Sequence, residues 1–292
     1  MVSTAPGPLL QLDNGVQMPA LGLGVGAVEE STGRAVGSVE AALRAGYRLV
    51  DTASVYGNEG EVADGLTRSG VPREEVFLTT KLWIADYGYD SALRSFEASL
   101  RRLQTDHVDL YLLHQPMPWD FDATVQAYRA LETLLADGRA RAIGVCNFSE
   151  QHLARLAAAT DVVPAVNQVE LHPYFSQPGL RRAHAAAGIT TQAWSPIGGV
   201  LSWNAGADGH PGPLADPVVT GIASELGKTP AQVLLRWHLD SGRSAIPKSW
   251  RPERIAENLD VFDVTLSVEQ ITLIDALDTG VRSGPDPDKR RA

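Results

Sequence analysis

Four side chains that could do chemistry together, a carboxylate, a phenol, an amine and an imidazole, occur in the first half of the chain. Asp51 stands at the end of a short apolar run, and Tyr56 lies in the loop that follows it. Lys81 ends the β-rich run 76–81, and His114 follows the β-rich run 108–113. In barrels of alternating strands and helices, the C-terminal ends of the strands house the chemistry. We therefore interpret these four positions as a candidate active site.

These groups are suited to proton transfer to a carbonyl compound. A tyrosine hydroxyl has an unperturbed pKa near 10 and is a poor acid at neutral pH, but a neighbouring ammonium lowers that pKa. Lys81 would tune Tyr56 in this way, and Asp51 would pair with Lys81 and hold it. His114 would bind and orient the carbonyl oxygen. Because such a relay has no source of electrons, carbonyl reduction also requires a hydride donor, a nicotinamide or a flavin.

The elements that must position these residues alternate along the chain. Strand-like runs fall at 47–51, 76–81, 108–113, 140–145, 163–168, 189–194 and 243–246, with helical stretches at 31–45, 58–69, 89–103, 121–136, 149–158, 178–187, 216–226 and 230–240. With a first strand at 21–23, this gives about eight β/α units. The pattern predicts an α/β fold, a single closed (β/α)8 TIM barrel formed by one domain over residues 1–292. An open doubly wound sheet with a small second domain is the alternative.

Three segments lie outside this alternation. Residues 9–18 predict an N-terminal hairpin with a type I′ turn at Asn14-Gly15. The loop 198–217 follows a strand and is placed to cover a site. The Pro/Gly-rich tail 280–292 predicts either a flexible end or a segment draped over the barrel mouth.

The run from Gly22 to Ala27 fits the dinucleotide pattern G-x-G-x-x-A. Pro19 interrupts the preceding strand, however, and no clear helix starts at the last small residue, so the context of a Rossmann phosphate loop is missing. We interpret the glycines instead as a tight strand end where backbone approaches a neighbour.

Composition limits the function classes. The chain has 292 residues, 44% of them hydrophobic and 21% charged, as in globular proteins with a sizeable core. A net charge of −10 argues against a nucleic-acid or anionic-membrane binder. The single cysteine, Cys146, excludes an internal disulfide framework and a multi-cysteine metal cluster. Without an apolar leader or a membrane-spanning run, we expect a cytoplasmic monomer that binds no metal and acts on a small substrate.

Several ordered motifs resemble the signatures of the aldo-keto reductase family over nearly the whole chain. They are Asp51-Thr-Ala-x-x-Tyr56-Gly-Asn-Glu59, Lys81-Leu-Trp83, Asp109-Leu-Tyr-Leu-Leu-His114, Gly144-Val-Cys-Asn147, Val166-Asn-Gln168 and Ile246-Pro-Lys248 with the residues that follow to Asn258. The tail and the last signature look most similar to bacterial reductases of the diketogluconate-reductase kind.

The resemblance implies NADPH-dependent reduction of aldehydes or ketones, with Tyr56 as the proton donor, Lys81 and Asp51 as its tuning pair and His114 as the carbonyl-orienting residue. It also implies a set of cofactor contacts: Asn147 and Gln168 on the nicotinamide carboxamide, Trp194 on the nicotinamide ring, Ser195 and Ile197 at the pyrophosphate, Lys248, Ser249 and Arg254 at the 2′-phosphate, and Glu257 and Asn258 near the adenine. Trp83, Gln115 and Trp119 would line the substrate pocket.

Four positions depart from the family pattern. Cys146 replaces a usual serine beside Asn147, and a thiol is the weaker hydrogen-bonding group for a carboxamide contact. Gly26 and Gln115 stand where many relatives place tryptophans, which predicts a more open pocket. Arg251 occupies a position that is often small and polar.

Other functions fit less well. A short-chain dehydrogenase needs Tyr-x-x-x-Lys, and no tyrosine here is followed four residues later by lysine. The seven histidines lack the spacing of a metal-dependent barrel hydrolase. A nicotinamide-binding regulatory subunit on the same barrel stays open as the non-enzyme alternative.

Overall fold

A barrel of parallel strands forms the centre of the molecule. The structure is a computed structural model that describes residues 7–26, 33–198 and 212–289. Within these ranges the strands follow the chain around the barrel: β3 (Leu23–Gly24), β4 (Leu49–Asp51), β5 (Phe77–Leu82), β6 (Val108–Leu113), β7 (Ala140–Cys146), β8 (Val166–Glu170), β9 (Thr190–Trp194) and β10 (Ser244–Ala245). Each strand pairs in parallel with the next.

The first and last strands meet and close the barrel. Leu21 forms a parallel bridge with Ala245, whose N–H donates to the carbonyl of Ala20 at 2.9 Å. In return, the N–H of Gly22 donates to the carbonyl of Ala245 at 3.0 Å. The predicted (β/α)8 barrel is therefore confirmed, and an open doubly wound sheet is not formed.

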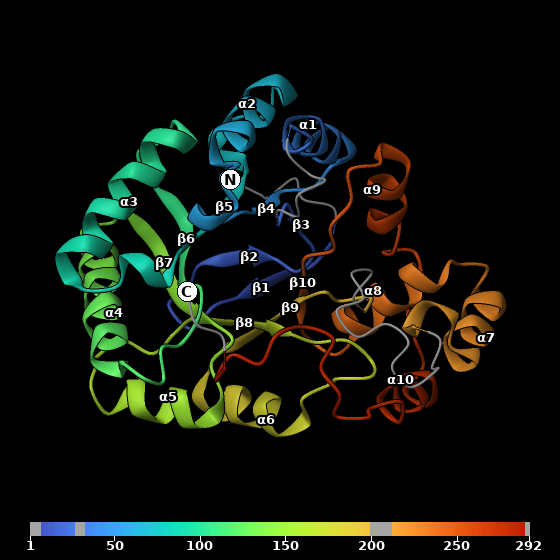
Figure 1. Cartoon of the computed structure of the whole chain (residues 1–292). Coiled ribbons are helices and arrows are strands. Elements are labelled where there is room, and N and C mark those ends of the chain that lie inside the picture. Colours follow the sequence, from blue (N-terminus) through green and yellow to red (C-terminus); the bar gives the residue numbers. More distant parts are fainter. Residues whose placement is uncertain (1–6, 27–32, 199–211, 290–292) are drawn as a thin grey trace.

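Helices surround the barrel (Figure 1). They are α1 (Ala35–Ala45), α2 (Glu59–Ser69), α3 (Tyr89–Leu103), α4 (Phe121–Ala136), α5 (Glu150–Ala157), α6 (Pro178–Ala187), α7 (Pro217–Leu226), α8 (Pro230–Asp240), α9 (Pro252–Leu259) and α10 (Val268–Asp275). The first eight lie close to the predicted bounds, whereas α9 and α10 were not predicted. Both are short, yet each carried a signal: Pro252 at the first helical position of α9, and a capping box between Ser267 and Gln270 in α10.

The N-terminal hairpin packs into one end of the barrel. Its strands β1 (Leu9–Gln11) and β2 (Gln17–Pro19) are antiparallel, and Leu12 and Met18 join the apolar cluster of the barrel interior. The predicted type I′ turn is wrong, because of the two central residues only Gly15 has a positive φ, of 83°. A longer loop forms instead, in which the Asn14 side chain donates to the carbonyl of Arg141 at 2.9 Å.

The glycines before α1 serve close packing, as predicted. A Cβ on Gly22 would lie 2.1 Å from a methyl of Leu49, and one on Gly24 would lie 2.8 Å from the carbonyl oxygen of Ile246. Gly24 therefore permits the close approach of the chain on either side of the barrel seam. The loop 198–217, predicted to cover a site, lies largely outside the described residues. Within the described ranges, no helix has both the length and the apolar character that a membrane crossing requires.

We predict that Gly24→Ala destabilises the protein by about 1–3 kcal/mol, the usual cost of overpacking, because the obstructing atom belongs to backbone that cannot rotate away. The matched control is Gly37→Ala in α1, where an added Cβ meets nothing within 4 Å. That change should stabilise by up to about 1 kcal/mol through helix propensity. Urea unfolding of both variants provides the measurement, and equal effects would contradict the role given to Gly24.

Candidate active site

A buried ion pair lies at the C-terminal end of the barrel strands. Asp51 is the last residue of β4, and Lys81 lies one residue before the end of β5. Lys81 Nζ is 2.5 Å from Asp51 Oδ1 and also donates to the carbonyl of Thr52 at 2.8 Å. Both side chains are almost completely buried. Because a buried charge needs a partner, each residue fixes the other.

Tyr56 and His114 lie beside this pair. Tyr56 belongs to a short 3-10 helix (Ser54–Tyr56), and the Ser54 hydroxyl ties that helix to the carbonyl of Lys81 at 3.0 Å. Lys81 Nζ lies 5.1 Å from the centroid of the Tyr56 ring. The Tyr56 hydroxyl lies 3.4 Å from His114 Nε2. The structure thus brings together all four residues singled out from the sequence.

Burial and neighbouring charges together decide the protonation of these groups. Burial raises the pKa of Tyr56, and the nearby Lys81 ammonium opposes the shift without cancelling it. Lys81 lowers the pKa of Tyr56, as predicted, but the net shift in that pKa is upward rather than toward neutral pH. Burial disfavours the ammonium of Lys81, whereas the Asp51 carboxylate and the Tyr56 phenol raise its pKa more. At neutral pH Tyr56 therefore carries its proton and Lys81 is charged.

A row of amides extends from Asp51 across the barrel. Gln168 Nε2 donates to Asp51 Oδ2 and to Gln192 Oε1, both at 2.7 Å. Gln192 Nε2 in turn donates to Ser244 Oγ at 3.0 Å. Sequence reasoning missed Gln192 and Ser244, because a polar residue within a strand carries no local signal of a partner across the barrel. Gln168 uses its amide hydrogens inside the barrel, which leaves its carbonyl oxygen for any further contact.

Asn147 and Trp194 form a second polar contact at the same edge. Asn147 follows β7, where it donates to the carbonyl of His114 at 3.1 Å and accepts from Trp194 Nε1 at 2.9 Å. The half-buried indole of Trp194 is thereby held at the end of β9. Asn147 and Ser195 have left-handed backbone, with φ of 64° and 50°. Cys146 differs from its neighbour, because it packs inside the barrel and is 1% exposed.

The predicted phosphate-binding segment lies between β10 and α9. Lys248 Nζ donates to the carbonyl of Gly26 at 2.7 Å and lies 4.7 Å from the centroid of the Trp250 ring. Burial lowers the pKa of Lys248. Arg254 is exposed in the first turn of α9, and Ser249 is half-buried just before that helix. Glu257 and Asn258 lie farther along α9, where Glu257 accepts from Thr229 Oγ at 2.8 Å.

The predicted pocket residues lie around His114 to different degrees. The Trp83 ring packs edge-on against His114, with 5.1 Å between ring centroids. Trp119 is exposed, whereas Gln115 is buried and its carbonyl accepts from the Tyr87 hydroxyl at 2.5 Å. A Cβ on Gly26 would lie 3.7 Å from the Tyr56 hydroxyl, so a large side chain there would crowd that group.

The fold and the site define a class of protein, a TIM barrel with a cluster of Asp51, Tyr56, Lys81 and His114 at the C-terminal ends of its strands, where enzymes of this fold place their active sites. No group of three or more His, Cys, Asp or Glu side chains suited to a metal ion occurs among the described residues.

Comparison with known proteins gives the family. A sequence model of the Aldo/keto reductase family matches residues 20–279, and the chain belongs to this family of oxidoreductases. The chain is 57% identical to a morphine 6-dehydrogenase of Pseudomonas putida over 284 residues, which cover 96% of this chain and 94% of that protein. It is 46% identical to a glyoxal reductase of Bacillus subtilis over 281 residues, 96% of each chain. The particular likeness to diketogluconate reductases stays a prediction.

Comparison with solved structures gives the same family. An aldo-keto reductase of Bombyx mori, in complex with NADP, superimposes with a TM-score of 0.88 and 34% identity, and the match covers 96% of each chain.

We predict that Cys146 resists thiol reagents in the folded protein. The thiol is buried, and burial raises its pKa, so little reactive thiolate is available. Labelling by a disulfide reagent at neutral pH should be at least about 10³-fold slower than in the denatured chain, because the site must first open. Rapid stoichiometric labelling of the native protein would show that the thiol is accessible.

Proposed function

We propose that this protein reduces aldehydes or ketones to alcohols with NADPH, and that Tyr56 donates the proton. The observation that carries the proposal is the contact between the protonated Tyr56 hydroxyl and His114, next to the charged Lys81. A carbonyl oxygen that approaches these two residues would meet an acid and a hydrogen-bonding imidazole together.

Each of the four residues has a separate task in this proposal. Tyr56 gives its proton to the carbonyl oxygen, and His114 orients that oxygen. The Lys81 ammonium stabilises the phenolate that remains on Tyr56. Asp51 holds Lys81 in place and favours its charged form. NADPH, when bound, supplies the hydride.

The residues at the barrel mouth fit a nicotinamide cofactor. The Trp194 indole is fixed through its Nε1, which leaves its ring available for stacking. The carbonyl oxygen of Gln168 can accept from a carboxamide, and Asn147 keeps a further donor hydrogen and an acceptor lone pair. Ser195 and Ile197 begin the loop assigned to the pyrophosphate, and Cys146 supports Asn147 from the core without offering its thiol.

The start of α9 fits a phosphate group. Lys248 and Ser249 precede this helix and Arg254 lies in its first turn, where the free N–H groups and the helix dipole favour an anion. These residues are assigned to the 2′-phosphate, with Glu257 and Asn258 toward the adenine. The relative from Bombyx mori, solved with NADP, supports the choice of cofactor.

The substrate class is best defined by assaying a panel of carbonyl compounds. One relative is named for morphine and another for glyoxal, so the panel should include both large and small carbonyl compounds. Gly26 leaves room beside Tyr56 for a bulky ketone. Oxidation of NADPH with small dicarbonyls, simple aldehydes and fused-ring ketones tests the proposal. Tight NADPH binding without turnover of any carbonyl would favour the regulatory alternative.

We predict that Tyr56→Phe lowers the rate of carbonyl reduction by about 10² to 10⁴, the usual contribution of general acid catalysis. NADPH affinity should stay nearly unchanged, because the assigned cofactor contacts lie on later elements. Steady-state kinetics and a cofactor titration provide the measurement. A variant that keeps more than about a tenth of the activity would remove Tyr56 from the role of proton donor.

We also predict that the double change Lys248→Met with Arg254→Ala raises the KM for NADPH steeply and leaves that for NADH almost unchanged. Each charge-assisted hydrogen bond to the phosphate contributes roughly 1.5–3 kcal/mol, so two give a preference of about 10² to 10⁴ before desolvation is subtracted. The control is Glu253→Gln, an exposed change in the same turn of α9. Equal losses with both cofactors would assign the cluster to the fold instead.

A further inference from the structure

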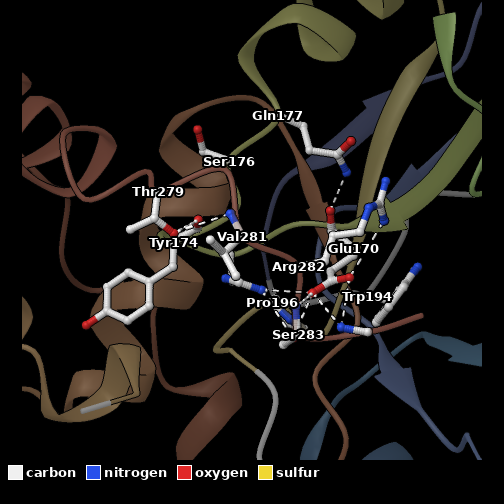
Figure 2. Close-up of polar contacts among 12 residues, drawn as sticks. Glu170, Tyr174, Ser176, Gln177, Trp194, Pro196, Thr279, Val281, Arg282 and Ser283 are labelled. Atoms are coloured by element: carbon white, nitrogen blue, oxygen red, sulfur yellow. Dashed lines mark hydrogen bonds and ion pairs between the residues drawn. The ribbon is translucent and has the colours of Figure 1, made fainter. Parts of the chain in front are cut away.

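A second buried carboxylate, Glu170, lies at the end of β8 and binds the C-terminal tail (Figure 2). Its Oε1 accepts from the N–H of Ser283 at 2.6 Å, from the Ser283 hydroxyl at 2.7 Å and from the N–H of Gly284 at 3.0 Å. Oε2 accepts from Gly284 N–H at 3.1 Å and lies 3.8 Å from an Arg282 guanidinium nitrogen. The barrel itself supplies His172 Nε2, at 3.0 Å from Oε1.

Most of the hydrogen bonds that the buried Glu170 carboxylate accepts therefore come from the tail. The Glu170 side chain is 0% exposed, and burial alone would raise its pKa. The hydrogen bonds from His172 and Ser283 lower the pKa more than burial raises it. A tail that left the barrel would take its hydrogen bonds to this carboxylate with it, which is unfavourable because bonds to a charged group are among the stronger ones. The hydrogen bonds to Glu170 thus stabilise the bound position of the tail.

The bound tail lies directly on Trp194. Glu170 and Trp194 are register partners on β8 and β9. A Cβ on Gly284 would lie 2.4 Å from Cη2 of the indole and 2.9 Å from Glu170 Oε2, so backbone of the tail packs against both side chains. With Asn147 at its Nε1 and Gly284 at its six-membered ring, the indole is held at two ends.

We propose that Glu170 is a positioning residue of the cofactor pocket: through its bonds to Ser283 and Gly284 it clamps the Trp194 indole in the orientation that receives the nicotinamide. This inference rests on the function proposed above. Glu170 touches neither substrate nor cofactor in it and acts through the tail alone.

The role of Glu170 in holding the tail, through Ser283 and Gly284, can be tested without any cofactor. Glu170→Gln removes the charge and places an amide NH2 against N–H donors. Trypsin should then cut after Arg282 roughly tenfold faster or more, because charge-assisted bonds are lost. Glu269→Gln, an exposed change in α10, is the control and should cut at the wild-type rate. A Glu170→Gln chain that resists trypsin as the wild type does would overturn the anchor.

A chain that ends at Thr279 separates the tail from other roles of Glu170. Thr279 itself binds the carbonyl of Tyr174 through its N–H at 3.0 Å, so this truncation keeps the preceding contact. Glu170→Gln should lower the melting temperature of the full-length chain. In the truncated chain it should leave that temperature nearly unchanged, since the tail donors that favour the carboxylate are absent there. The same destabilisation in both chains would show a purely structural role through His172.

Cofactor binding tests the positioning role. In the full-length chain, Glu170→Gln should weaken NADPH binding by roughly three- to tenfold, the scale expected when a preorganised ring is freed, and should have no effect after truncation. Gly284→Ala should also weaken NADPH binding, because the added methyl group would displace the tail from Trp194 while Glu170 stays intact. Unchanged affinity in both variants, with tight wild-type binding, would overturn this inference alone. A wild-type protein that does not bind NADPH would overturn the proposed function as well.

Discussion

The ion pair between Asp51 and Lys81 is the constraint on which the site depends. Taking a carboxylate and an ammonium out of water costs several kcal/mol for each ion, which only close pairing and further hydrogen bonds offset. The barrel meets that demand with strands far apart in sequence: β4 supplies Asp51, β5 supplies Lys81, and β8 supplies the Gln168 amide. Asp51 and Lys81 are on neighbouring strands and Gln168 reaches Asp51 from the other side of the barrel, so the complete set of contacts exists only in the folded chain.

Glu170 satisfies the same demand in a different way. Asp51 takes its side-chain partners from the barrel strands β5 and β8, whereas most partners of Glu170 belong to the C-terminal tail. The first arrangement is fixed by strands of the barrel, and the second depends on a segment that lies outside the barrel. In the functions proposed above, the proton-transfer residues are thus held by the barrel strands, whereas the orientation of Trp194 also depends on the C-terminal tail.

Much of this was predictable from local pattern. Alternating strand-like and helical runs predicted the barrel, and strand-end polar residues predicted the four that meet around Tyr56. Other features depend on distances that no local pattern encodes. The upward shift in the pKa of Tyr56 reflects how deeply the barrel buries it. The bond from Lys248 to Gly26 joins residues 222 positions apart, and the Glu170 anchor joins residues 113 apart. The tail sequence alone left two alternatives, and only the fold shows residues 280–289 lying on the barrel.

Left-handed backbone at non-glycine residues occurs in two kinds of place, at helix ends and at the barrel mouth. Among the described non-glycine residues, Gln104, Asn147, Gln177 and Ser195 have positive φ. Gln104 and Gln177 are at helix ends, where a left-handed residue helps to reverse the chain. Asn147 and Ser195 instead follow β7 and β9, on either side of β8, and flank the Trp194 contact. Such conformations cost of order 1–3 kcal/mol and persist where surrounding structure enforces them. The strain at the barrel mouth is thus held by the strands, and it orients the Asn147 amide toward the backbone carbonyl of His114 and the Trp194 indole.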